Sequence, residues 1–146
     1  MQKIQRTMKK FYTIILFAFV GTIANAQYTK LLDFSGAANG SHPYGSLISD
    51  GTFLYGMAND GGTNNMGAIF KIKPDGTGYA NLFDFSGANG SAPNGSLIYD
   101  GTFLYGMTGQ GGTNNMGTLF KIKPDGTADT VLLNFAGAAN GSYPAA

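Results

Sequence analysis

One stretch of this sequence returns almost unchanged about 50 residues further along the chain. Gly51–Thr77 reads GTFLYGMANDGGTNNMGAIFKIKPDGT, and Gly101–Thr127 reads GTFLYGMTGQGGTNNMGTLFKIKPDGT. The residues before each copy also match, and a third copy begins at Leu132 and extends through Pro144. Self-similarity at a fixed period of this length is typical of repeat architectures, in which each period is one supersecondary unit.

Each period contains short apolar segments separated by turn residues. In the first period the strand-like segments are Lys30–Phe34, Ser46–Ser49, Phe53–Met57 and Ala68–Lys73. Asn-Gly, Asp-Gly and Pro-Asp-Gly-Thr sequences between the segments favour tight turns, because glycine and asparagine accept positive φ angles and proline presets φ. No window of the repeats has a convincing helical period.

Four short antiparallel strands in about 50 residues match the size of a β-propeller blade. We therefore predict an all-β fold of tandem four-stranded antiparallel blades, β-propeller-like and incomplete, with two full repeats and part of a third. The alternatives are a β-sandwich, which has no reason to repeat its sequence, an up-and-down barrel, and a β-solenoid, which would need shorter coils. The predicted boundaries are about 30–78 for repeat 1, about 79–128 for repeat 2 and about 129–146 for the partial repeat 3.

Residues 1–26 have the layout of a secretory signal peptide. Positively charged residues precede the apolar run Phe11–Ile23, and Ala24–Ala26 forms a small-x-small cleavage site before Gln27. The alternative is an N-terminal membrane anchor, but the run is shorter than the roughly 20 residues that a spanning helix needs. We therefore expect a secreted or cell-surface protein, with a repeat region over residues 27–146 and no membrane span after signal cleavage.

Charge and composition exclude several classes of function. Without residues 1–26 the chain has five lysines and eight aspartates, a net charge of −3, against +1 for the whole sequence. A basic surface for nucleic acid is therefore absent. The sequence has no cysteine, which excludes disulfides and cysteine catalysis, and a zinc site would have to combine the single His42 with carboxylates. No cofactor and no metal site are predicted.

The aspartates are the remaining source of catalytic groups. Asp50, Asp75, Asp100 and Asp125 each precede a glycine in a turn, where a carboxylate is expected to accept hydrogen bonds from nearby backbone amides. The glycine-rich loop after Met57 lacks the Lys-Ser/Thr of a phosphate-binding loop. Asp60 with Asn64 and Asn65 offers oxygen ligands for calcium, but the second copy replaces the carboxylate by Gln110. No catalytic residue is predicted.

Positions that differ between such similar copies are candidates for a binding surface. They fall in loops and at strand ends, where repeat arrays usually place partner contacts, although such loops also vary without function. Their tyrosine, asparagine and aspartate side chains suit an extracellular glycan or protein ligand. The candidate binding residues are His42, Tyr44, Asn59, Asp60, Asn94 and Gln110.

Several spaced motifs together resemble the GloVer tandem-repeat family. The matching pieces include Leu54–Gly56, Gly61-Gly62, Phe70-Lys71, Pro74–Thr77 and Gly95–Ile98, together with their counterparts. This family occurs in exported bacterial proteins described as choice-of-anchor tandem repeat proteins, and the resemblance covers essentially all of residues 27–146. It implies a propeller-like array but does not imply an enzyme activity, since none is generally assigned to the repeat. The resemblance leads us to expect a C-terminal anchoring segment and more than two full copies, whereas the given residues show two full copies and the start of a third.

The sequence thus predicts an exported non-enzymatic repeat protein that serves as a cell-surface or secreted binding or scaffold module. The alternative is a propeller-type glycan-active enzyme, a hydrolase or lyase with aspartates as acid and base, of which this chain is a fragment. A closed ring needs about four to eight blades. We therefore expect that further blades or self-assembly are needed to close the array.

Overall fold

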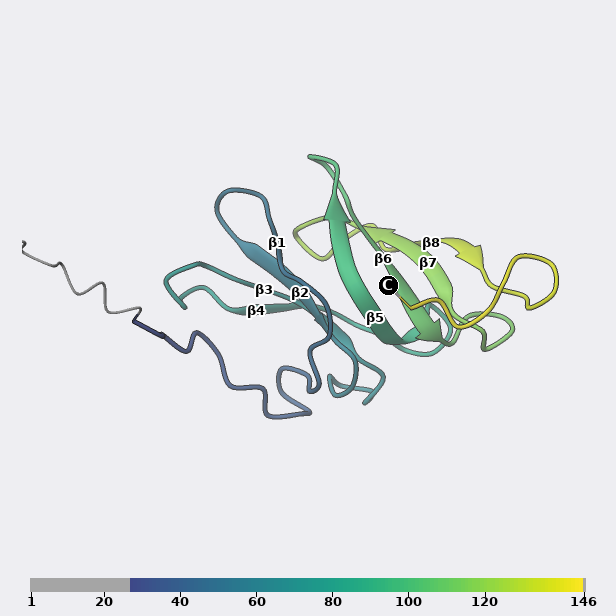
Figure 1. Ribbon diagram of the computed structural model, residues 1–146, viewed down its shortest axis with the longest axis horizontal. Helices are drawn as coiled ribbons and strands as arrows, with labels where there is room; N and C mark the ends of the chain where they lie inside the picture. Colours follow the sequence, from purple (N-terminus) through teal and green to yellow (C-terminus); the bar gives the residue numbers. More distant parts are fainter. Residues whose placement is uncertain (1–26, 146) are drawn as a thin grey trace, which may run out of the picture.

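The computed structural model describes residues 27–145, so the predicted signal peptide lies outside the described part of the chain. These residues form an all-β fold of two four-stranded antiparallel sheets, without a helix and without closure into a ring. The two sheets lie side by side (Figure 1). In the described region there is accordingly no helix that could cross a membrane. The predicted fold of incomplete, propeller-like blades is confirmed.

The strands follow one another across each sheet in the order of the chain. The first sheet consists of β1 (Ile48–Ser49), β2 (Leu54–Ala58), β3 (Ala68–Ile72) and β4 (Ala80–Asp84). The second sheet consists of β5 (Ser91–Tyr99), β6 (Leu104–Gln110), β7 (Thr118–Ile122) and β8 (Thr130–Asn134). Asp-Gly turns join β1 to β2 and β5 to β6, Pro-Asp-Gly turns join β3 to β4 and β7 to β8, and a longer glycine-rich loop joins the two middle strands of each sheet. Pairing within each sheet is therefore local.

The sequence prediction grouped the strands wrongly by one position. It placed Lys30–Phe34 as the first strand of a repeat, but this segment belongs to neither sheet, and its counterpart β4 closes the first sheet by pairing with β3. The reason is that the tight turn Pro74–Thr77 folds β4 directly back onto β3, with Lys73 N donating to Thr77 O at 2.9 Å. Lys30–Phe34 has a strand-like sequence without a preceding hairpin partner in the described residues.

The segment before the first sheet nevertheless continues the repeat in space. Phe34 packs edge-on against Phe70, with ring centroids 5.2 Å apart and an interplanar angle of 69°. Phe85, which follows β4, packs against Phe120 of the second sheet with the same distance and angle. Residues 27–35, called here the lead-in, therefore lie against the first sheet as the end of β4 lies against the second.

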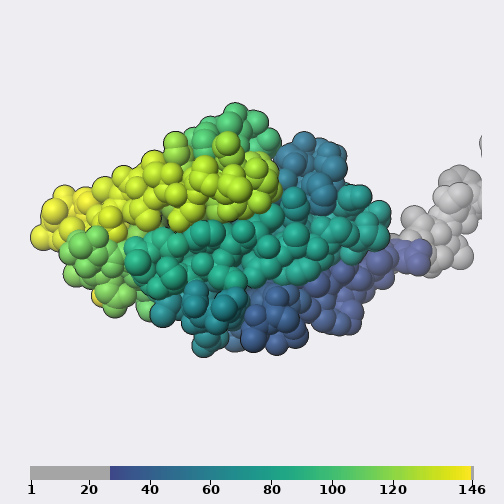
Figure 2. Space-filling view, turned by 180° about the vertical axis from the view of Figure 1, so that it is seen from behind, coloured from purple at the N-terminus to yellow at the C-terminus, as the bar shows by residue number. Residues whose placement is uncertain are grey.

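The residues after β8 continue the repeat at the other end. Tyr143 N donates to Met116 O at 2.8 Å, as Ala92 N donates to Met66 O at 3.0 Å one repeat earlier. Residues 136–145, called here the tail, thus begin a third copy. The lead-in and the tail lie at opposite ends of one continuous body (Figure 2).

The hydrophobic core lies between the two sheets. Alternation along each strand gives each sheet two faces, and the first sheet contributes one face while the second contributes the opposite one. The buried core residues are Tyr55, Met57, Ile69, Phe85, Leu97, Leu104, Phe120 and Ile122. Gly106 lies beneath this cluster, where a Cβ atom would stand only 2.7 Å from the Phe120 ring. The missing side chain lets that ring lie across the neighbouring strand.

Candidate functional site

The predicted binding residues lie where β2 and β6 end. Ser41 forms an antiparallel bridge with Asp60, and Ser91 pairs in the same way with Gln110. The ends of β2 and β6 are therefore equivalent places in the two repeats. We call this surface the loop rim, made of Ser41–Tyr44, Asn59-Asp60, Asn94 and Gln110.

His42, Tyr44 and Asp60 form one cluster on the loop rim. His42 Nδ1 and Asp60 Oδ2 are 3.0 Å apart, and both side chains face solvent. The Tyr44 ring stacks on the His42 ring with centroids 6.5 Å apart and an interplanar angle of 21°. Two aromatic rings and a carboxylate are thus accessible together.

A second cluster crosses from one sheet to the other. Asn59 Nδ2 donates to Asn94 Oδ1 at 2.7 Å and to Pro93 O at 3.2 Å. On its other side Asn94 lies against Gly109, where a Cβ atom would stand 2.8 Å from Asn94 Nδ2. Because Asn59 and Asp60 are consecutive, the two clusters form one surface.

Gln110 occupies in the second sheet the position that Asp60 occupies in the first. It has no imidazole beside it, because Ala92 stands where the first copy has His42. The structure therefore brings five of the six predicted residues together and leaves Gln110 one repeat away along the same rim.

The backbone of the loop rim is held in the same conformation in all three copies. His42 has φ 51°, Ala92 has φ 51° and Tyr143 has φ 50°. A left-handed conformation is unusual for residues with a Cβ atom and costs roughly 1–2 kcal/mol. The copies thus present imidazole, methyl and phenol groups from one fixed backbone position.

The turn aspartates have the structural role that the sequence predicts. Asp100 Oδ1 accepts from Thr102 N at 2.8 Å and Phe103 N at 2.7 Å, while Asp100 Oδ2 accepts from Tyr105 OH at 2.8 Å. Asp50 makes the same three contacts in the first repeat. The amides of Phe103 and Thr102, followed by the Tyr105 hydroxyl, hold the pKa of Asp100 below its ordinary value of 3.8.

These turn contacts predict how stability depends on pH. A folded-state pKa below the unfolded value means that the ionised Asp100 stabilises the fold above about pH 4, and that this contribution is lost as the pH falls through the lowered pKa. We expect the melting temperature to be nearly constant between about pH 7 and 5 and to fall below about pH 4. Asp100→Asn should make this acid loss shallower in calorimetric scans.

Asp129→Asn provides the control of opposite sign. Burial raises the pKa of Asp129, outweighing the hydrogen bond from Asn89, so ionised Asp129 opposes folding and its protonation regains stability as the pH falls. Asp129→Asn should therefore make the acid loss steeper. Equal acid slopes in wild type and both variants would contradict the assignment.

The asparagines of the repeated Gly-Gly-Thr-Asn-Asn-Met-Gly loop bind backbone groups of their own repeat. Asn65 Oδ1 accepts from Gly61 N at 3.2 Å, and Asn64 Nδ2 donates to Phe85 O at 2.9 Å. The second copy repeats both contacts. Since these amides bind the backbone and Asp60 faces His42, the calcium ligand set considered from the sequence is not assembled.

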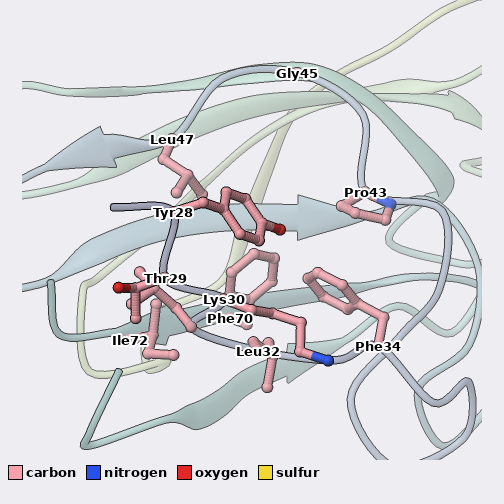
Figure 3. A pocket seen from close by; sticks show the side chains of 11 residues that line it. Tyr28, Thr29, Lys30, Leu32, Phe34, Pro43, Gly45, Leu47, Phe70 and Ile72 are labelled. Atoms are coloured by element: carbon pink, nitrogen blue, oxygen red, sulfur yellow. The ribbon is translucent and has the colours of Figure 1, made fainter. Parts of the chain in front are cut away.

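The sequence did not predict a cavity beside the lead-in. It has a volume of about 330 Å³ and is lined chiefly by apolar side chains, among them Tyr28, Phe34, Leu47, Phe70 and Ile72. Figure 3 shows these side chains around the hollow. Aligning the copies could have found it, because Leu47, Phe70 and Ile72 match the core residues Leu97, Phe120 and Ile122 of the second sheet.

Comparison with known proteins identifies the repeat. A family model described as the Gloeobacter/Verrucomicrobia repeat matches residues 16–146, which includes all of the described chain. No curated protein and no solved structure matches the chain. The resemblance predicted from the spaced motifs is confirmed.

Proposed function

The chain belongs to the Gloeobacter/Verrucomicrobia repeat family, and from this premise we propose that it is an exported, non-enzymatic module that binds a glycan through the loop rim. The observation that carries this proposal is the accessible cluster of His42, Tyr44 and Asp60, joined to the Asn59–Asn94 pair. The cluster lies on a backbone that is the same in each copy while its side chains differ. Such a surface can be adapted to a ligand without disturbing the sheets.

The chemistry of the loop rim suits a sugar. The stacked rings of His42 and Tyr44 offer an apolar face that also has polar edges. The Asp60 carboxylate accepts hydrogen bonds from hydroxyl groups, and the amides of Asn59 and Asn94 both donate and accept. No lysine belongs to the rim, which makes an anionic ligand a poorer fit.

Binding without catalysis is supported by how the carboxylates are used. Hydrolysis of a glycoside generally needs two carboxyl groups about 5–10 Å apart. Asp60 is the single carboxylate of the rim, and its counterpart in the second repeat is Gln110. Asp50 and Asp100 each have one carboxylate oxygen bound by turn amides and the other by the tyrosine hydroxyl of the next strand. No specific observation favours the glycan-active enzyme.

A glycan array tests this proposal with a matched control. The full sequence is expressed in a bacterial host, and the secreted product should begin at Gln27 by intact mass; a product that keeps residues 1–26 would count against export. Wild type should bind at least one glycan class. The triple variant Asn59→Ala, Asp60→Ala, Gln110→Ala should bind it at least about tenfold more weakly, because each substitution removes a hydrogen-bonding group that contributes to the binding free energy.

Lys123→Ala, at an exposed position next to the turn between β7 and β8, is the control and should bind as wild type does. Wild type that binds no glycan, or a triple variant that binds unchanged, would refute the proposed role of the loop rim.

A further inference from the structure

Two sheet faces lie against no other sheet, although their counterparts form the core between the sheets. Leu47 is 49% exposed, whereas Leu97, at the same position of the second repeat, is 3% exposed. Ile98 is 69% exposed, whereas its counterpart Ile48 packs against the core cluster. Tyr105 is likewise more exposed than the buried Tyr55. We call the side of the first sheet that carries Leu47 the leading face, and the side of the second sheet that carries Ile98 and Tyr105 the trailing face.

The internal junction between the sheets shows what fits each face. At this junction Leu97, Phe120 and Ile122 pack against Tyr55, Met57 and Ile69. The leading face has the same set as the first of these groups, namely Leu47, Phe70 and Ile72, around the cavity of about 330 Å³. Phe70 and Ile72 are 4% and 3% exposed, because the lead-in covers them. The trailing face offers Tyr105, Met107 and Leu119, which repeat the second group almost unchanged.

We propose that copies of this chain associate head to tail, with the trailing face of one copy on the leading face of the next. Tyr105 and Met107 of the first copy then lie over Leu47 and Phe70 of the second, as Tyr55 and Met57 lie over Leu97 and Phe120 within the chain. Such a contact joins two different surfaces and closes into a ring when the rotation allows. Propeller rings of about four to eight blades correspond to two to four copies.

This register requires two peripheral segments to move. In the docked pair Phe135 of one copy takes the place of Phe34 in the next copy, against Phe70, and the tail gives way to residues 36–44 of that next copy. Phe135 of one copy then lies next to Ser35 of the next copy, in the arrangement that Phe85 and Ser86 have as consecutive residues of one chain. The exchange favours β8, because β8 is paired with β7 whereas the lead-in is outside both sheets.

Polar residues at the edge of the internal junction, both those that recur and those that differ between the repeats, also fit a contact with a second copy. Ser46 N donates to Ser96 Oγ at 2.8 Å across the internal junction, and both serines recur where two copies would meet. Within the chain Asn59 binds Asn94. Between two copies the equivalent positions are Gly109 of one copy and Tyr44 of the next, so that a smaller residue faces a larger one. The loop rim then runs on from one copy to the next.

Complementation between two blocked variants tests the proposal. Leu47→Lys blocks the leading face and Met107→Lys blocks the trailing face, and each should weaken association at least about tenfold in sedimentation velocity, since a charge would be buried without a partner. Wild type should form discrete oligomers of two to four copies. An equimolar mixture of the two variants should form a one-to-one dimer that grows no further, because it has one intact pair of faces.

The segment exchange has its own matched pair of variants. Phe34→Ala should strengthen association about threefold or more, because it loosens a segment that docking displaces. Phe135→Ala should weaken it, because Phe135 packs on Phe70 only in the docked pair. Ala88→Lys, at an exposed turn between the sheets, should associate as wild type does.

A wild-type protein that stays monomeric at all concentrations would overturn the proposal. A mixture of blocked variants that forms no dimer would also overturn it. So would association that survives both lysine substitutions, which is the result expected if the copies associated through residues 1–26. If circular dichroism shows that a lysine variant is unfolded, the milder Leu47→Ser and Ile98→Ser replace the blocked pair, with the same outcomes required.

Discussion

Replacing Phe120 by alanine is expected to lower the free energy of unfolding by about 3–5 kcal/mol. Phe120 is fully buried between the sheets and packs edge-on against Phe85 with ring centroids 5.2 Å apart. Truncation removes apolar burial and leaves a cavity that two paired sheets have little freedom to fill. A loss of this size is a large part of the stability of a small domain. Urea unfolding followed by tyrosine fluorescence and circular dichroism measures it.

The two equivalent leucines provide the control for this prediction. Leu97→Ala should cost about 2–5 kcal/mol, because Leu97 lies in the core between the sheets. Leu47→Ala should cost less than about 1 kcal/mol in dilute protein, because Leu47 is half exposed. Both leucines follow Gly-Ser and precede Ile, so their local sequence is the same. Equal losses would show that the main core is not between the sheets.

Gly117→Ala is expected to cost about 3 kcal/mol or more. Gly117 has φ +97°, which disfavours any residue with a Cβ atom, and a Cβ atom there would overlap the backbone carbonyl oxygen of Thr108. The clash involves backbone in the neighbouring strand β6, so it cannot be relieved by turning a side chain. Phe135 N also donates to Gly117 O at 3.0 Å, and any shift of this residue weakens that contact.

Gly101→Ala separates the two causes. Gly101 has the same φ of +97°, but nothing lies within 4 Å of the position that a Cβ atom would take there. Its substitution should therefore cost only the conformational strain, about 1–2 kcal/mol. Chemical unfolding could give the same loss of unfolding free energy for Gly101→Ala and Gly117→Ala. The loop around Gly117 would then accommodate the methyl group, which would contradict the close packing of β6 on this loop.

Much of the local structure could be predicted because it depends on neighbours in sequence. The turn role of Asp100 follows from a carboxylate placed two and three residues before the amides that it binds. The alternation of Tyr55 and Met57 with Leu54 and Gly56 assigns the faces of β2 in the same way. Which strands share a sheet was predicted wrongly, because Lys30–Phe34 and β4 have similar sequences and differ only in having a hairpin partner.

The candidate site was predicted as a set of variable positions and not as a geometry. His42 contacts Asp60 across 18 residues of sequence, and Asn59 contacts Asn94 across 35. These contacts depend on how the loops meet after the sheets have formed. The comparison of copies could identify the residues, but only the fold places five of them together.

The repeat by itself determined the unit of this protein: four strands, their turns and the faces of each strand, all set by interactions over a few residues. Only the tertiary structure decided which side chains are buried, because burial depends on which element packs against that face of the sheet. Leu47 and Leu97 have the same neighbours in sequence, yet one is 49% exposed and the other 3%. The physical reason is that Leu97 faces another sheet, whereas within the described chain Leu47 faces a cavity.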